Sequence, residues 1–127
     1  MKPIKFRAWD KENKKMFKVQ NLDFGSKGTY LGAVDETLTF RVPEDIIVMQ
    51  YTGLKDKHKK EIYEGDILQR WNNVQKIWEN KIIVYSIEDF YFDESHEFNL
   101  WGGNEEYQIR GNIYKNPELL ENKNERD

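Results

Sequence analysis

Residues 49–68 read MQYTGLKDKHKKEIYEGDIL, and this stretch decides the fold because it joins two apolar segments through a charged turn. The run from Ile46 to Tyr51 has the length of a β-strand, and a second apolar segment begins at Ile67. Between them, Gly65 permits a bend with positive φ, and Asp66 is placed to accept hydrogen bonds from nearby backbone amides. The stretch therefore predicts a structural corner between two strands rather than a catalytic loop.

Most of the chain alternates apolar and polar residues with a period of two, as half-buried strands do. The segment IKFRA (4–8) is an example, and residues 4–22 predict an N-terminal hairpin. Residues 30–42 predict a second hairpin. One short C-terminal helix is expected where Asn116 and Pro117 supply a cap and a first helical residue. Many short strands with a single helix predict an all-β fold, a small barrel or pseudo-barrel with an SH3-like element in its C-terminal half.

Length and composition narrow the possible classes of protein. A chain of 127 residues and 15.3 kDa is expected to form one domain. It has no cysteine, which excludes disulfides, thiolate metal sites and a thiol nucleophile. No apolar run reaches the length of about 18 residues that a membrane span requires. We therefore expect no membrane association and a cytoplasmic location.

Charge is distributed unevenly, although the net charge is only −3. Residues 1–20 carry a net charge of +5 and residues 54–60 a net charge of +3, whereas residues 86–106 carry −7. The basic segments could meet phosphate groups, or the basic and acidic segments could meet each other across subunits. A solvated surface without a partner explains the same pattern.

The basic segments supply the candidate contacts to nucleic acid. Lysine and arginine neutralise phosphates, and aromatic rings provide surfaces on which bases stack. The candidates are Lys5, Arg7, Trp9, Lys55, Lys57, Lys59 and Lys60. Further stacking platforms are expected among Tyr51, Tyr63, Trp71 and Trp78. The acidic segment argues against this function, because it would repel the same polymer.

No arrangement typical of an enzyme is found in the sequence. The glycine-rich stretches lack the spacing of a phosphate-binding loop, and neither histidine forms a motif with a serine. We therefore assign no catalytic, cofactor-binding or metal-binding residue. A metal-dependent activity at Asp89–Glu97 (DFYFDESHE) is a weaker alternative, since its spacing matches no known ligand motif.

Several short blocks in the same order give the chain a resemblance to the YopX family of phage and prophage proteins. The blocks are IKFRAWD (4–10) with KKM (14–16), MQYTGLKD (49–56), EIYEGDIL (61–68) and GNIYKNPELL (111–120). The resemblance implies one YopX-like β domain over residues 1–120, followed by a frayed polar tail at 121–127. The turn at residues 57–60 lacks the glycine that is usual in the family, so a wider or differently bent turn is expected there.

The resemblance implies no established activity. We expect a non-enzymatic bacteriophage or prophage accessory protein in the cytoplasm of a bacterial host, without a cofactor, that acts by protein–protein binding or self-assembly. Its partner would be a second copy of the chain or a protein of the host or phage. Fourteen per cent aromatic residues fit this hypothesis, because such residues are enriched at interfaces. The alternative is a small β-barrel module that binds nucleic acid through segments 1–20 and 55–60.

Overall fold

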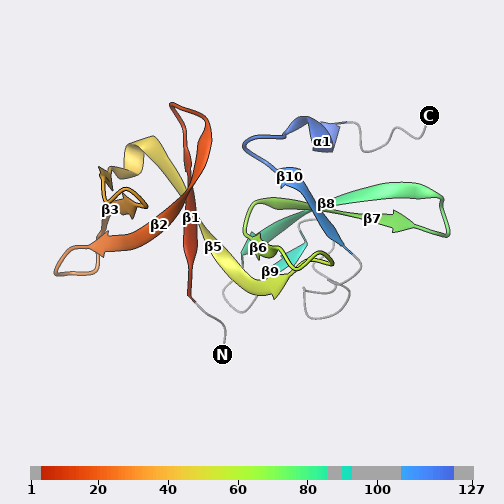
Figure 1. Ribbon diagram of the computed structural model, residues 1–127, viewed down its shortest axis with the longest axis horizontal. Helices are drawn as coiled ribbons and strands as arrows, with labels where there is room; N and C mark the ends of the chain where they lie inside the picture. Colours follow the sequence, from red (N-terminus) through yellow and green to blue (C-terminus); the bar gives the residue numbers. More distant parts are fainter. Residues whose placement is uncertain (1–3, 86–89, 93–106, 122–127) are drawn as a thin grey trace. The chain divides into compact units, whose positions relative to one another are not determined.

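The computed structural model describes residues 4–85, 90–92 and 107–121, and they form an almost entirely antiparallel β structure (Figure 1). The chain divides into two compact units, an N-terminal unit of residues 3–51 and a C-terminal unit of residues 52–127 together with residues 1–2. The single domain expected over residues 1–120 stays a prediction, because compactness alone does not decide whether the units fold independently.

The N-terminal unit is a sheet of consecutive hairpins. Its strands are β1 (Phe6–Asp10), β2 (Lys15–Phe24), β3 (Tyr30–Asp35), β4 (Phe40–Arg41) and β5 (Ile46–Lys55), and the 3₁₀ turn η1 (Pro43–Asp45) precedes β5. The sheet order is β4-β3-β2-β1-β5, and the last residues of β5 continue into the C-terminal unit. Both hairpins expected from the sequence are confirmed. The buried core consists of Ala8, Ala33 and Ile46, with Phe17, Val19, Leu22 and Val48 packed around them.

The C-terminal unit is built around the hairpin of β7 (Asp66–Asn72) and β8 (Ile77–Tyr85). The four-stranded sheet order is β10-β7-β8-β9, where β9 is Phe90–Phe92 and β10 is Gln108–Asn112. Strand β6 (Glu61–Tyr63) pairs with β5, and the short helix α1 (Glu118–Glu121) follows β10. The core of this unit contains Ile62, Leu68, Ile83 and Tyr107, with Leu54 and Ile109 packed against it.

These strands form an all-β fold with an N-terminal hairpin and a short C-terminal helix, as expected, but they do not close into a barrel. Among the described strands, both sheet orders have two separate ends. Closure requires a matched tilt and stagger of every strand, and β4 contains two residues. Alternation in a sequence reports which face of a strand is buried and not which edges pair, so it could not distinguish open sheets from a barrel.

A strand-end aspartate or asparagine organises most of the hairpin turns. The Asp10, Asp35, Asp56 and Asn72 side chains each accept hydrogen bonds from two backbone amides of the turn that follows. Each turn then contains a non-glycine residue with positive φ: Lys14 at 56°, Leu38 at 67°, Lys59 at 72° and Lys76 at 60°. The side-chain hydrogen bonds therefore support a backbone conformation that glycine adopts more easily.

No helix in the described part of the chain is long and apolar enough to cross a bilayer.

Candidate binding surfaces

Two buried aspartates of the N-terminal unit share one arginine. Arg41 forms an ion pair with Asp10 and a second one with Asp35, at 3.4 Å between Nη1 and Oδ2. Its guanidinium also lies 4.7 Å from the centre of the Phe17 ring. The backbone and side-chain amides of Asn13 hold the pKa of Asp10 well below its usual range, and Arg41 contributes to the same shift against the opposing effect of burial. The Thr37 hydroxyl, followed by the Thr39 amide, lowers the pKa of Asp35.

Asp56 fixes the basic turn of residues 57–60 in the C-terminal unit. Its Oδ1 accepts hydrogen bonds from the amides of His58 and Lys60, and its Oδ2 accepts one from Ile109 on β10 at 2.9 Å. Burial opposes ionisation, yet these three amides lower the pKa of Asp56. The turn closes without glycine because Lys59 takes the positive φ. All four side chains of the basic turn are exposed.

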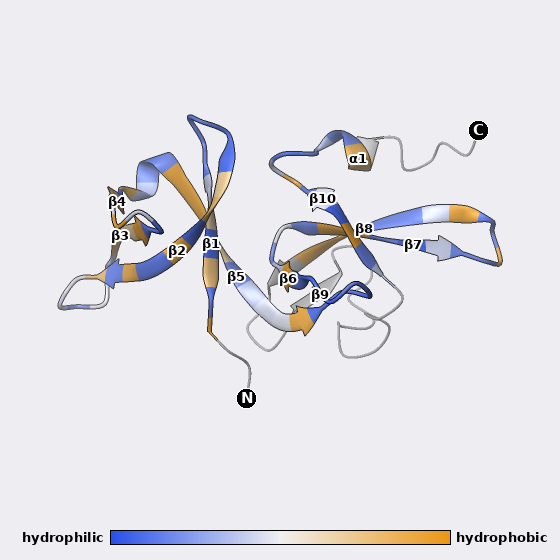
Figure 2. Ribbon diagram, viewed as in Figure 1, coloured by the Kyte–Doolittle hydropathy of each residue, from blue (hydrophilic) through white to orange (hydrophobic). Residues whose placement is uncertain are grey.

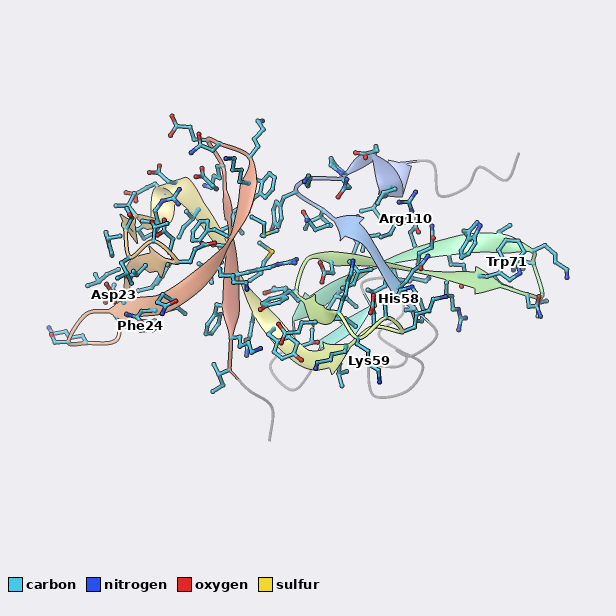
Figure 3. All side chains as sticks on the ribbon, viewed as in Figure 1. Asp23, Phe24, His58, Lys59, Trp71 and Arg110 are labelled. Atoms are coloured by element: carbon cyan, nitrogen blue, oxygen red, sulfur yellow. The ribbon has the colours of Figure 1, made fainter. Side chains whose placement is uncertain are left out.

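Aromatic side chains collect on one face of β2, β3 and β4. The Phe24 and Tyr30 rings lie 6.1 Å apart between centroids. Two residues farther along β3, the Phe40 ring covers Gly32 so closely that a Cβ there would lie 2.6 Å from Phe40 Cζ. Strands β3 and β4 are correspondingly hydrophobic in Figure 2, and Figure 3 places Phe24 beside Asp23 on β2. We call Phe24, Tyr30, Leu38, Phe40 and Val42 the apolar face.

The apolar face is open to solvent to an unusual degree. Leu38 is 73% exposed, Phe24 56% and Phe40 48%. The Tyr30 hydroxyl is buried and finds no hydrogen-bond partner among the described residues, and burial raises the pKa of this phenol. Contiguous exposed apolar residues of this kind mark interaction surfaces more often than random exposure does.

A row of polar side chains crosses the C-terminal unit on one face of β10, β7 and β8. Gln108 Nε2 donates to Gln69 Oε1 at 3.2 Å, and Gln69 Nε2 donates to Asn80 Oδ1 at 3.2 Å. Asn80 Nδ2 then donates to the backbone carbonyl of Leu119 in α1 at 2.9 Å. At the other end, His58 Nε2 lies 3.2 Å from Gln108 Oε1. We call His58, Gln108, Gln69 and Asn80 the polar row.

Two tryptophans lie beside the polar row. Trp71 pairs with Trp78 across β7 and β8, and their rings meet edge to face with centroids 5.2 Å apart. Residues two apart on a strand share a face, so Trp71 lies on the same face as Gln69, and Trp78 on the same face as Asn80. Trp71 is 44% exposed and Trp78 53%. We call these two residues the tryptophan pair.

The residues predicted to contact nucleic acid fall into two groups with different surroundings. In the N-terminal unit, Lys5 is exposed with its Nζ 5.2 Å from the centre of the Tyr51 ring, whereas Arg7 is half-buried and Trp9 is buried. In the C-terminal unit, Lys55 and the lysines of the basic turn are all exposed. Tyr51 is also buried and Tyr63 is half-buried, so the tryptophan pair is the most exposed of the predicted stacking platforms. Contact with nucleic acid itself stays a prediction for all of these residues.

The described residues contain no group of three or more histidine, aspartate or glutamate side chains that could hold a metal ion. The alternative metal site at Asp89–Glu97 lies outside the described residues, apart from the backbone of β9.

The corner predicted at Gly65 and Asp66 is confirmed. The Asp66 carboxylate accepts a hydrogen bond from the Tyr63 amide at 2.8 Å, and Gly65 has a φ of 89°.

Sequence reasoning identified the basic turn and the tryptophans but missed the polar row and the apolar face. The polar row forms through strand register, which pairs Gln108 with Gln69 and Gln69 with Asn80. The apolar face likewise depends on pairing between β2, β3 and β4. Leu38, Phe40 and Val42 alternate with polar residues, which is the pattern of a buried face, so the sequence contained no signal that these side chains are exposed.

Comparisons with known proteins support the family resemblance. The model of the YopX protein family matches residues 5–121, which span both units. A crystal structure of protein EF1440 from Enterococcus faecalis is similar, with a TM-score of 0.74, 26% identity and coverage of 94% of this chain and 99% of that one. Protein yopX from Bacillus subtilis shares the fold, with a TM-score of 0.64, 22% identity and coverage of 94% and 97%. No curated protein sequence matches the chain. The family match, which extends over nearly the whole chain, establishes that this protein belongs to the YopX family.

Proposed function

We propose that this chain is a non-enzymatic bacteriophage or prophage accessory protein of the bacterial cytoplasm that acts by self-association. In this proposal, the apolar face of one copy docks on the apolar face of a second copy. The observation that carries it is the exposure of Phe24 on β2 and Phe40 on β4, with Leu38 exposed in the turn that precedes β4. Burying such side chains releases roughly 25 cal/mol for each Å² removed from water.

A second copy fits this surface for two reasons. The N-terminal unit carries eight lysines and arginines against seven aspartates and glutamates, a net charge of +1, so two copies meet without strong repulsion. Symmetric pairing of identical surfaces is also the commonest form of oligomer.

Three buried carboxylates have structural roles, which supports a function without catalysis. The pKa values of Asp10, Asp35 and Asp56 are all lowered, so these groups stay ionised at neutral pH. A general acid needs a raised pKa, and a general base needs an open lone pair aimed at a substrate. Here the oxygens accept hydrogen bonds from turn amides instead.

Sedimentation equilibrium over a wide concentration range tests the proposal. The expected result is a mass approaching twice 15.3 kDa as the concentration rises. Leu38→Asn and Phe40→Thr should return the mass toward that of one chain. Asparagine tolerates the positive φ at residue 38 and threonine suits a strand, so both variants are expected to fold.

Val74→Thr is the matched control, because Val74 is 91% exposed and lies in the C-terminal unit. It should leave the association unchanged. A mass of one chain at every concentration would overturn self-association, and so would a dimer that Leu38→Asn and Phe40→Thr leave intact. In either case a host or phage protein becomes the partner to seek.

A further inference from the structure

The hydrogen bonds of the polar row all run in one direction, and the direction is fixed by its last acceptor. The Leu119 carbonyl can only accept, so Asn80 must present its Nδ2 there and its Oδ1 to Gln69. Gln69 therefore donates from Nε2 to Asn80 and accepts at Oε1 from Gln108. Gln108 in turn donates from Nε2, so its Oε1 faces His58. His58 therefore carries a proton on Nε2. Each amide of the row uses one N–H and one lone pair in this chain, which leaves a second N–H and a second lone pair on each amide for a ligand.

The tryptophan pair adds a stacking surface next to these donors and acceptors. Aromatic rings bind bases through their π-faces with little regard to sequence. The edge-to-face contact between Trp71 and Trp78 holds both rings in place while leaving each about half exposed. The Gln69–Asn80 pair is the next cross-strand pair on the same face as Trp71–Trp78, so a base stacked on either tryptophan lies beside these two amides.

The basic turn supplies positive charge at the other end of the row. Lys57, Lys59 and Lys60 surround His58, which is itself hydrogen-bonded to Gln108. The carboxylate of the turn, Asp56, is buried and points its oxygens at three backbone amides. Figure 3 places His58 and Lys59 in the turn, Trp71 on the β7–β8 hairpin and Arg110 on β10, all within the C-terminal unit. Residues 54–60 therefore carry a net charge of +3, although the whole chain carries −3.

From this arrangement we infer a second function, the binding of single-stranded nucleic acid across the polar row. Phosphates lie against the lysines of the basic turn, and bases contact the row amides and stack on the tryptophan pair. The bases must be unpaired, because rings stacked inside a duplex cannot reach a tryptophan face. The surface differs from the one inferred for self-association and lies in the other unit.

This inference can be tested by fluorescence anisotropy of labelled oligothymidine and oligouridine, each about ten nucleotides long, titrated with the full chain at two salt concentrations. Binding is expected to weaken with salt. Lys57→Gln with Lys60→Gln should lower the slope of log K against log salt by about 0.7 for each phosphate that the variant no longer neutralises. Trp71→Ala should weaken binding by about tenfold or more, and binding should quench tryptophan fluorescence in the parent chain.

Lys27→Gln is the control for loss of a lysine charge away from the proposed surface, since Lys27 is exposed in the N-terminal unit. It and Leu38→Asn should bind as the parent chain does, and circular dichroism should show that Trp71→Ala keeps its fold. Three results would each overturn the inference: no binding to either oligomer at low salt, equal affinity for a duplex of the same length, or binding that Trp71→Ala and the lysine variants leave unchanged. Tighter binding of one oligomer would show whether RNA or DNA is preferred within the same chemistry.

Discussion

The two units differ in the side-chain networks that link their strands. In the N-terminal unit, the charges of Asp10 and Asp35 are held by Arg41. In the C-terminal unit, the neutral amides of Gln108, Gln69 and Asn80 form a row that ends on a backbone carbonyl. Buried charges depend on their partners far more than neutral amides do. We therefore expect the arginine–aspartate network to be sensitive to charge removal and to acid, whereas the polar row is free to exchange hydrogen bonds with a ligand.

Removing the shared arginine should have the largest effect. Arg41→Met leaves two aspartates without their cation, and the free energy of unfolding should fall by about 3 kcal/mol, as for other broken buried pairs. Urea unfolding followed by circular dichroism measures this change. Arg70→Met is the control in the other unit, because Arg70 is more exposed and pairs with Glu79 at 3.3 Å. It should lose about 1 kcal/mol or less from that ion pair. Equal losses would contradict the contrast between the units.

The aspartate of the basic turn gives the next largest effect. In Asp56→Asn, one side-chain oxygen still accepts the amides of His58 and Lys60, but an NH₂ group now faces the Ile109 amide. Two donors then oppose each other, and the free energy of unfolding should fall by about 2 kcal/mol. Faster hydrogen exchange at Ile109 should accompany the loss. A variant as stable as the parent would show that this aspartate does not hold the turn on β10.

Acid should destabilise the fold through the same carboxylates. Asp10 has a pKa in the folded state below its ordinary value of 3.8, so its ionisation stabilises the protein above that pH. This contribution is lost as the pH falls from about 5 through 3.8 and toward the lower folded value. In Asp10→Asn, the slope of unfolding free energy against pH should decrease by about one proton in this range. Asn80→Ala, which removes an amide of the polar row, should leave this slope unchanged. A changed slope in Asn80→Ala would contradict the contrast between the charged aspartates and the neutral polar row.

Glycine at the left-handed turn positions should give the smallest effect, and a stabilising one. Lys14 and Lys59 hold positive φ values of 56° and 72°, one in each unit. Lys14→Gly and Lys59→Gly should each raise the free energy of unfolding by about 0.5 kcal/mol, because relief of side-chain crowding exceeds the added chain entropy. The double variant should show the sum, measured by urea unfolding. A loss of stability would mean that the lysine side chains stabilise these turns.

Sequence reasoning reached the strands, both N-terminal hairpins and the role of Gly65 and Asp66, because each of these depends on neighbouring residues. It could not reach the open sheets or the polar row, which depend on register between strands such as β10 and β7. It also predicted the same stacking role for Trp9 and Trp71, because alternation does not distinguish a ring in the core from one on the surface. The structure buries the first and exposes the second.

The most direct test of two separate binding faces is a pair of amide NMR titrations on the same labelled protein. Raising the protein concentration should shift resonances of Phe24, Leu38, Phe40 and their neighbours in the N-terminal unit. Adding oligothymidine at low protein concentration should instead shift those of the basic turn, Gln69, Gln108 and the tryptophan pair. Two distinct sets of shifts are the predicted result. One shared set, or no shifts in either titration, would contradict the presence of two separate binding faces.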